Sequence, residues 1–262
     1  MKNQLLPIQK GSNFRQLTGY VNREHLTIKP HKLIRSGHLG QLTDDDVKFL
    51  EDYGVVYNMD FRTDHEITTM PDRVLRDADY IKNPVFSEEI AKNAVRTVDI
   101  TKNTIDDPKF GYKHLISCYH DIILNDHPRQ AYRTFFDYLL KNDQDNQAIL
   151  YHCSEGKDRT GMATIFLLSA LDFDEETIKK DYLLTNPATT AYLNSCLAVA
   201  HENDADEATI EAITDLATVR SDYVDYAFNL INEKYGDMPT FLEEVLNLTP
   251  QKIAKLKAIY LH

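Results

Sequence analysis

A cysteine and an arginine six positions apart, Cys153 and Arg159, form the segment whose residue types point most directly to chemistry. A thiol attacks phosphorus only as the thiolate, so its surroundings must favour the anion. The five residues between them can curl so that backbone N–H groups point into one concavity, above the positive end of a following helix. Such a loop favours the thiolate and holds a dianionic phosphoryl group, while the planar fork of Arg159 binds two of its oxygens. The spacing predicts a phosphate-binding loop with its own nucleophile.

Cys153 would be a packed core cysteine if the apolar run before it simply continued, since free cysteines are often buried. The following residues argue otherwise, because only polar residues and glycines separate Cys153 from Met162. A polar stretch between an apolar run and a helical one is typical of a functional loop. We therefore interpret Cys153 as a nucleophile.

The neighbouring residues have narrower expected roles. Gly156 is expected to adopt a backbone angle that a side chain would resist. His152 precedes the nucleophile on a strand, so its ring should point away from Cys153 and orient the loop through an N–H group. Thr160 is expected to donate its hydroxyl to the Cys153 sulfur, to cap the following helix, or to do both. Phosphate binding is assigned to Ser154, Glu155, Gly156, Lys157 and Thr160, beside Arg159.

The general acid that protonates the leaving group is harder to identify. Asp158 is the leading candidate because it lies inside the loop, next to Arg159. It can equally be a structural carboxylate paired with an arginine. Asp60, Asp64 and Asp72, on or after an earlier strand, are the alternatives.

These residues need secondary structure to hold them in place. Residues 148–152 predict a buried strand that leads into the loop, and residues 160–171 predict the helix that leaves it. Strands alternating with helices imply an α/β fold with a parallel-rich sheet flanked by helices, and a site at the carboxyl ends of the strands. Further strands are expected over 33–35, 55–61 and 80–85, and further helices over 43–53, 112–124 and 130–140.

The whole chain, residues 1–262, is expected to form a single domain, since no repeat or low-complexity tract marks a linker. Residues 1–173 would hold the sheet and the loop 153–159. Residues 174–262, where nearly every pattern is helical, would form a cover integrated with that core. Within the cover, residues 198–217 lack a wide apolar stripe, which predicts either a mobile lid or a solvated connector between packed helices.

Charge and composition restrict the partners. The chain has 29 basic and 41 acidic residues, and its net charge of −12 disfavours nucleic acid and an anionic bilayer. No run of about 18 apolar residues predicts a membrane span, and no signal peptide is evident. Three cysteines are too few for a disulfide framework and fit a reducing compartment. We expect a cytoplasmic protein, with leaderless export left open and the oligomeric state unknown.

The loop also resembles a known family. Residues 152–161 match the HCxxxxxR[ST] signature of the cysteine-dependent phosphatases, in a GKDRTG form. This form resembles the atypical bacterial branch of tyrosine and dual-specificity phosphatases that includes mycobacterial PtpB and Listeria LipA. Other segments of the chain resemble the same branch, namely residues 13–20, 34–39, 60–63, 181–186, 219–220 and 235–236.

The resemblance implies a phosphotyrosine phosphatase-like fold in which C-terminal helices cover the active site. It also implies an aspartate at the position of Asp158 and supporting roles for Arg15, Asp60 and Arg62. Phosphoinositide phosphatases often carry lysine in this loop, so Lys157 would extend the substrates beyond phosphotyrosine, unless it points outward to solvent.

We therefore expect an enzyme that hydrolyses phosphotyrosine through a phosphocysteine intermediate, without a metal or other cofactor. Phosphoserine, phosphothreonine and phosphoinositides are possible extensions, and the partner is a phosphorylated protein or a phosphoinositide. Three alternatives remain. In the first, the true substrate of the same enzyme is a lipid phosphate. In the second, the chain is a phospho-ligand binding module without turnover. In the third, it is a sulfur transferase or an arsenate reductase that uses a similar loop.

Overall fold

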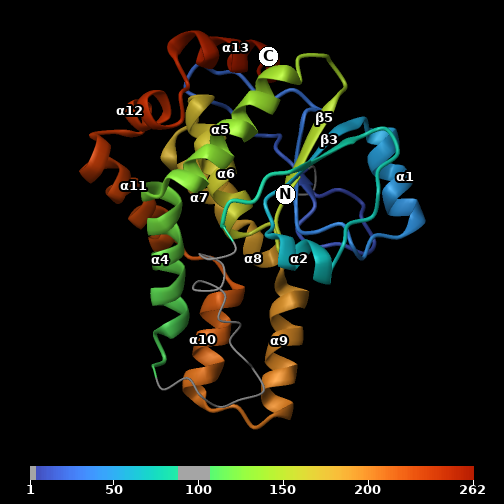
Figure 1. The fold of residues 1–262 in the computed structure, drawn as a ribbon, viewed down its shortest axis with the longest axis vertical. Helices are drawn as coiled ribbons and strands as arrows, with labels where there is room; N and C mark the ends of the chain where they lie inside the picture. Colours follow the sequence, from blue (N-terminus) through green and yellow to red (C-terminus); the bar gives the residue numbers. More distant parts are fainter. Residues whose placement is uncertain (1–3, 88–106) are drawn as a thin grey trace.

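The protein, described by a computed structural model over residues 4–87 and 107–262, has an α/β fold built on a five-stranded sheet (Figure 1). The strands are β1 (Arg15–Gln16), β2 (Leu33–Ser36), β3 (Val55–Asp60), β4 (Asp79–Lys82) and β5 (Ala148–His152). They lie in the order β1-β2-β5-β3-β4, and β2, β5, β3 and β4 are parallel. The short β1 pairs antiparallel with β2. This arrangement confirms the predicted parallel-rich sheet.

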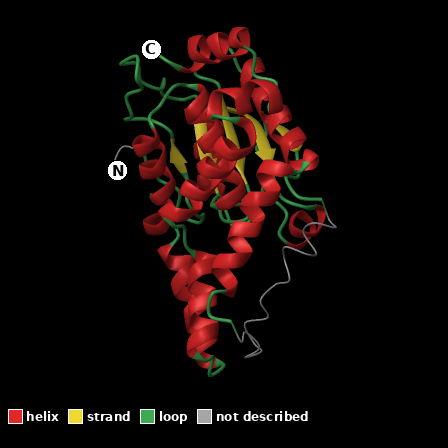
Figure 2. Ribbon diagram, turned by 90° about the vertical axis from the view of Figure 1, so that its left-hand side faces the viewer, coloured by secondary structure: helices red, strands yellow, loops and turns green. Residues whose placement is uncertain are grey.

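Helices lie on both faces of the sheet (Figure 2). No helix in the described ranges is long and apolar enough to cross a membrane. The helices are α1 (Asp44–Tyr53), α2 (Asp64–Thr69), α4 (Phe110–Leu124), α5 (Asp126–Lys141), α6 (Asp158–Ala170), α7 (Glu175–Leu183), α8 (Thr185–Ala188), α9 (Thr190–Glu202), α10 (Glu207–Ala217), α11 (Ser221–Tyr235), α12 (Met238–Thr240), the π-helix Phe241–Val245 and α13 (Pro250–Tyr260).

The central strand β5 shows how the two faces are divided. All five of its residues are buried, and successive side chains point to opposite faces. Ile149 and Tyr151 join the larger apolar cluster, whereas Ala148 and Leu150 join a smaller one with Leu50 of α1. Because both faces are covered, the strand reads in the sequence as one continuous apolar run.

The boundaries of α1 follow from local chemistry. Thr43 and Asp46 form a capping box at its start, in which each side chain accepts a hydrogen bond from the other residue's backbone N–H. Gly54 ends the helix with a φ of 94°, a left-handed angle that glycine adopts readily. The predicted start and stop of this helix are therefore confirmed.

The C-terminal part is helical, as predicted. Tyr182 of α7, Phe241 of the π-helix and Tyr260 of α13 belong to the same apolar cluster as Tyr151 in β5. In contrast, α9 and α10 lie side by side and extend away from the sheet (Figure 1). These two helices contain the segment 198–217, and its movement as a lid stays a prediction.

A buried group of charges joins the N-terminal strands to α7. Asp181 of α7 lies 2.8 Å from Nη1 of Arg35 in β2 and 3.5 Å from Nη2 of Arg15 in β1. The hydroxyl of Tyr20 also donates to this carboxylate, at 3.2 Å. Burial opposes the charge on Asp181, but the two arginines outweigh it and keep the pKa of Asp181 below its ordinary value. Two guanidinium groups thus share one carboxylate in the interior.

We expect Asp181→Ala to lower the free energy of unfolding by about 3–5 kcal/mol, because it leaves two buried arginines without a counter-charge. Urea denaturation measures this change. Asp225→Ala is the matched control, since Asp225 is 46% exposed and pairs with Lys179 on the surface. An exposed pair contributes about 0–1 kcal/mol, so equal losses in the two variants would contradict the structural role given to Asp181.

Candidate active site

The loop lies at the edge of the sheet where the parallel strands end. Strand β5 ends at His152, Cys153 follows directly, and α6 begins at Asp158. The strand, loop and helix expected around the nucleophile are thus present. The ends of β2 and β3 lie on either side, since Ser36 and Asp60 are both in register with His152.

The loop's carbonyl groups are held on its outer side. The backbone N–H of His38 donates to the carbonyl of Ser154 at 3.0 Å. The carbonyl of Gly156 accepts from Nδ2 of Asn13 at 2.8 Å and from Nη2 of Arg35 at 2.9 Å. In a trans peptide the N–H of the next residue points opposite to the carbonyl. Fixing these carbonyls outward therefore turns the following N–H groups towards the concavity, as an anion-binding nest requires.

Gly156 has no room for a side chain. Its φ is +64°, and a Cβ atom there would lie 2.3 Å from the carbonyl oxygen of Ser36. The loop therefore packs directly against the end of β2. The predicted need for glycine at this position is confirmed, and its cause is both the backbone angle and this close approach.

Arg159 is oriented by a carboxylate that the sequence analysis missed. Its Nη1 and Nη2 atoms each lie 2.7 Å from one oxygen of Glu66, a two-pronged ion pair. The Ser154 hydroxyl donates to the same carboxylate. Burial opposes ionisation of Glu66, but Arg159 outweighs it and holds the pKa of Glu66 far below its ordinary range.

Glu66 is itself fixed by the start of α2. The side chain of Thr63 caps this helix, and Glu66 accepts hydrogen bonds from the Thr63 backbone N–H at 2.9 Å and from the Thr63 hydroxyl at 3.1 Å. The spacing Thr63-x-x-Glu66 is a capping-box pattern and is visible in the sequence. That pattern identifies a helix start, but it carries no sign that the same carboxylate contacts an arginine 93 positions later.

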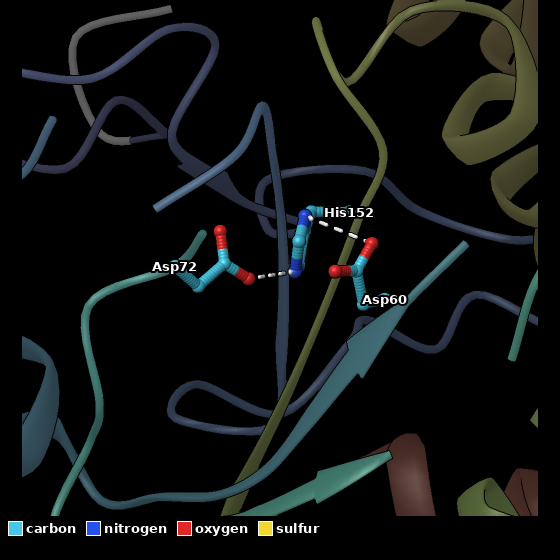
Figure 3. A group of neighbouring side chains, drawn as sticks. All are labelled: Asp60, Asp72 and His152. Atoms are coloured by element: carbon cyan, nitrogen blue, oxygen red, sulfur yellow. Dashed lines mark ion pairs between the residues drawn. The ribbon is translucent and has the colours of Figure 1, made fainter. Parts of the chain in front are cut away.

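Asp60, Asp72 and His152 gather behind the loop (Figure 3). The His152 ring lies 3.0 Å from Asp72 and 3.8 Å from Asp60. Burial would lower the pKa of His152, but the two carboxylates outweigh it and raise the pKa above its ordinary value. The ring nitrogen Nδ1 lies 3.2 Å from the carbonyl oxygen of Cys153 and can donate to it, which fits the predicted orienting role of His152.

These three residue types also occur in metal sites, yet a cation already lies between the carboxylates. Nη2 of Arg62 is 2.7 Å from Asp60 and 2.9 Å from Asp72. The two acids are therefore paired with Arg62 and His152, which does not fit a metal site. Asp60 and Arg62 contact each other, and Asp60 lies beside His152, whereas Arg15 donates to the side chain of Asn13, which in turn donates to the Gly156 carbonyl. Supporting roles for Asp60, Arg62 and Arg15 stay a prediction.

Lys157 is engaged by two carbonyl groups and a carboxylate. Its ammonium group donates to the carbonyls of Leu216 at 2.6 Å and Thr218 at 3.2 Å, and lies 3.2 Å from Asp158. Two of its three N–H bonds are thus used on carbonyls, and its charge is paired with Asp158. The lysine is 4% exposed and does not point to solvent. It connects the loop to the end of α10, and phosphate binding by Lys157 stays a prediction.

Of the four candidate acids, Asp158 is partly accessible, whereas the side chains of Asp60 and Asp72 are almost fully buried and Asp64 lies on the surface. The Asp158 side chain is 23% exposed, and Oδ1 accepts a hydrogen bond from the hydroxyl of Tyr119 at 3.1 Å. Asp60 and Asp72 are instead enclosed in the group with Arg62. Asp64 is 59% exposed and pairs with Lys82.

The side chains of Ser154 and Glu155 are hydrogen-bonded to other residues of the protein. The hydroxyl of Ser154 is engaged by Glu66, as described above. The carboxyl group of Glu155 is hydrogen-bonded to Ser12, and burial raises the pKa of Glu155 to about 7. Phosphate binding by these two residues stays a prediction, and it would be made through their backbone.

One role expected for Thr160 is wrong. Because α6 begins at Asp158, with Lys157 at the N-cap position, Thr160 lies inside the first turn and does not cap the helix. Its buried hydroxyl has no hydrogen-bond partner within residues 4–87 and 107–262. The expected bond to the Cys153 sulfur is therefore not formed in this structure, although the hydroxyl is available to make one.

Comparison with known proteins agrees with this geometry. A sequence model of the tyrosine phosphatase family matches residues 6–262, so the chain belongs to the tyrosine phosphatase family. A protein of Cupriavidus necator that carries the provisional name of tyrosine-protein phosphatase is 24% identical over 250 residues, 95% of this chain and 86% of that protein.

Two further relatives match over shorter stretches. A tyrosine-protein phosphatase of Nostoc commune is 28% identical over 154 residues, 58% of this chain and 47% of that relative. The triple specificity protein phosphatase PtpB of Mycobacterium tuberculosis is 28% identical over 104 residues, 37% of this chain and 38% of that protein. The relatives support phosphatase activity and agree with the expected likeness to PtpB.

We expect Glu66→Gln to lower kcat/KM for p-nitrophenyl phosphate by about 10- to 100-fold, because a neutral amide replaces the charged partner that orients Arg159. Steady-state kinetics measures the loss. Asp64→Asn, which removes a carboxylate from the exposed side of the same helix, should leave the rate within about twofold. If Glu66→Gln hydrolysed p-nitrophenyl phosphate faster than the wild type, Glu66 would compete with the phosphate for Arg159 instead of orienting it.

Proposed function

We propose that this protein is a cysteine-dependent phosphatase that hydrolyses phosphotyrosine through a phosphocysteine intermediate. The observation that carries the proposal is the loop from Cys153 to Arg159. Its carbonyls at Ser154 and Gly156 are bonded on the outer side, which leaves N–H groups for a phosphoryl group between a thiol and a guanidinium. This arrangement stabilises the charge that develops on transferred phosphoryl oxygens.

The first step forms a bond between sulfur and phosphorus. The thiolate of Cys153 attacks in line, and the bond between phosphorus and the tyrosyl oxygen breaks, with its electron pair leaving on that oxygen. Asp158 supplies the proton that the leaving oxygen takes up. Arg159 stays oriented by Glu66, and its guanidinium charge stabilises the equatorial oxygens.

The second step releases phosphate. A water molecule attacks phosphorus and gives its proton to the Asp158 carboxylate, and the bond between sulfur and phosphorus breaks to restore the thiolate. Both steps need only groups of this chain and water. The available Thr160 hydroxyl fits the expected stabilisation of the departing sulfur.

Phosphotyrosine is the substrate that the comparisons favour, since the relatives are named as tyrosine-protein phosphatases. Phosphoserine and phosphothreonine remain in the proposal because one relative is named as a triple specificity phosphatase. The case for phosphoinositides depended on Lys157 as a second free cation. Its engagement with Leu216, Thr218 and Asp158 weakens that case.

Cys153→Ser should abolish phosphate release from a phosphotyrosine peptide, because the hydroxyl is a far weaker nucleophile than the thiolate, while inorganic phosphate still binds. Cys196→Ser, which changes another free cysteine, is the control and should keep near-normal rates. A soluble phosphoinositide at the same concentration tests the lipid alternative. Normal turnover by Cys153→Ser would contradict the mechanism, and phosphate binding without turnover in the wild type would favour a binding module.

Asp158→Asn should slow hydrolysis of phenyl phosphate more than that of p-nitrophenyl phosphate, by about a further tenfold or more, since a poor leaving group depends more on proton donation. The ratio of the two kcat/KM values gives the answer. Equal losses on both substrates would assign Asp158 a structural role, as a carboxylate paired with Lys157.

A further inference from the structure

Three buried tyrosines from three helices form a group next to the Asp158 side chain. Tyr119 comes from α4, Tyr182 from α7 and Tyr223 from α11, and each is at most 1% exposed. The Tyr119 hydroxyl donates to Oδ1 of Asp158 at 3.1 Å and also makes a short hydrogen bond with the Tyr182 hydroxyl. The Tyr223 hydroxyl, in contrast, has no hydrogen-bond partner among the described residues.

The order of donation in this chain is fixed by chemistry. Once Asp158 has given its proton to the leaving oxygen, its carboxylate only accepts hydrogen bonds, so in that state the single O–H of Tyr119 is used on Asp158. Tyr182 must then donate to the oxygen of Tyr119. Burial raises the pKa values of Tyr119 and Tyr182 well above the ordinary value of tyrosine, so both hydroxyls remain protonated donors. Such linked donors strengthen one another in a medium of low dielectric constant.

The tyrosine hydroxyl supplies something that the neighbouring lysine does not. The ammonium of Lys157 lies 3.2 Å from Oδ2 of Asp158 and acts largely as a point charge. A hydroxyl on a fully buried ring is directional, because packing fixes the ring. It therefore holds one oxygen of Asp158, and with it the plane of the carboxyl group, in one orientation.

We propose that Tyr119 is a positioning residue for proton transfer by Asp158, and that Tyr182 supports it by donating to the Tyr119 hydroxyl. This inference rests on the proposed function, in which Asp158 exchanges a proton with the leaving oxygen and then with water. A proton is transferred efficiently only when donor and acceptor are held close and aligned. Tyr119 contributes that alignment without contacting the substrate.

The test compares three changes of tyrosine to phenylalanine, each of which removes one hydroxyl and keeps the ring. Tyr119→Phe should lower kcat for phenyl phosphate by about tenfold, with KM nearly unchanged, because it removes a hydrogen bond to a charged group. The loss for p-nitrophenyl phosphate should be smaller than about threefold, since that leaving group needs less help. Tyr182→Phe should show the same pattern at reduced size, and Tyr223→Phe, the matched control, should show none.

A second readout separates positioning from a structural role. In the Asp158→Asn background, Tyr119→Phe should cost less than about twofold, because the group that it positions is already gone. A structural defect would persist in that background and would affect both substrates equally. Either result, or a Tyr223→Phe loss as large as that of Tyr119→Phe, would overturn the inference.

Failure of this inference can be told apart from failure of the proposed function. If the wild type hydrolyses both aryl phosphates, Cys153→Ser does not, and Tyr119→Phe is indistinguishable from the wild type on both, only the positioning role is refuted. If the wild type releases no phosphate, or Cys153→Ser retains the rate, the proposed function is refuted and the positioning role falls with it. Thermal unfolding of each variant checks that the fold is retained.

Discussion

The orientation of the peptide planes in the loop from Cys153 to Arg159 is the constraint on which the rest of this site depends. A loop of this length binds a phosphoryl group only if its carbonyls face outward, and each outward carbonyl needs its own donor inside the protein. Asn13, Arg35 and His38 provide those donors from the N-terminal part of the chain. The need for these donors accounts for features that seem unrelated in the sequence, including the close packing of Gly156 on the end of β2.

Holding arginines in place requires acids, and the structure meets that need in three separate groups. Arg159 pairs with Glu66, Arg62 with Asp60 and Asp72, and Arg15 and Arg35 share Asp181. In the third group the cations outnumber the acid, and one of them, Arg35, donates directly to the loop at Gly156. An excess positive charge therefore lies beneath the concavity, which compensates locally for the strongly acidic chain around it. Net charge alone says little about a site of this kind.

The sequence was sufficient for features that depend on neighbouring residues, and insufficient for those that depend on distant ones. The strand before Cys153, the helix after it, the start and end of α1 and the need for glycine at 156 were predicted from local patterns. Glu66 and Tyr119 were missed, because a capping glutamate and a core tyrosine look ordinary until the fold brings them to Arg159 and Asp158. Thr160 was misplaced because the helix begins two residues earlier than its pattern indicates.

The group around Asp181 has a consequence for how the protein folds. Its hydrogen bonds join residues 146 and 166 positions apart in the chain, and the Asn13 bond to Gly156 spans 143. Closing such long loops is slow and comes late, after local helices and the first strand pairs have formed. Because Arg35 donates both to Asp181 of α7 and to the Gly156 carbonyl, docking of α7 should help to fix the shape of the phosphate-binding loop. A nascent chain that already contains the nucleophile would therefore complete its loop only after that helix has emerged from the ribosome, so synthesis itself delays the appearance of a fully formed site.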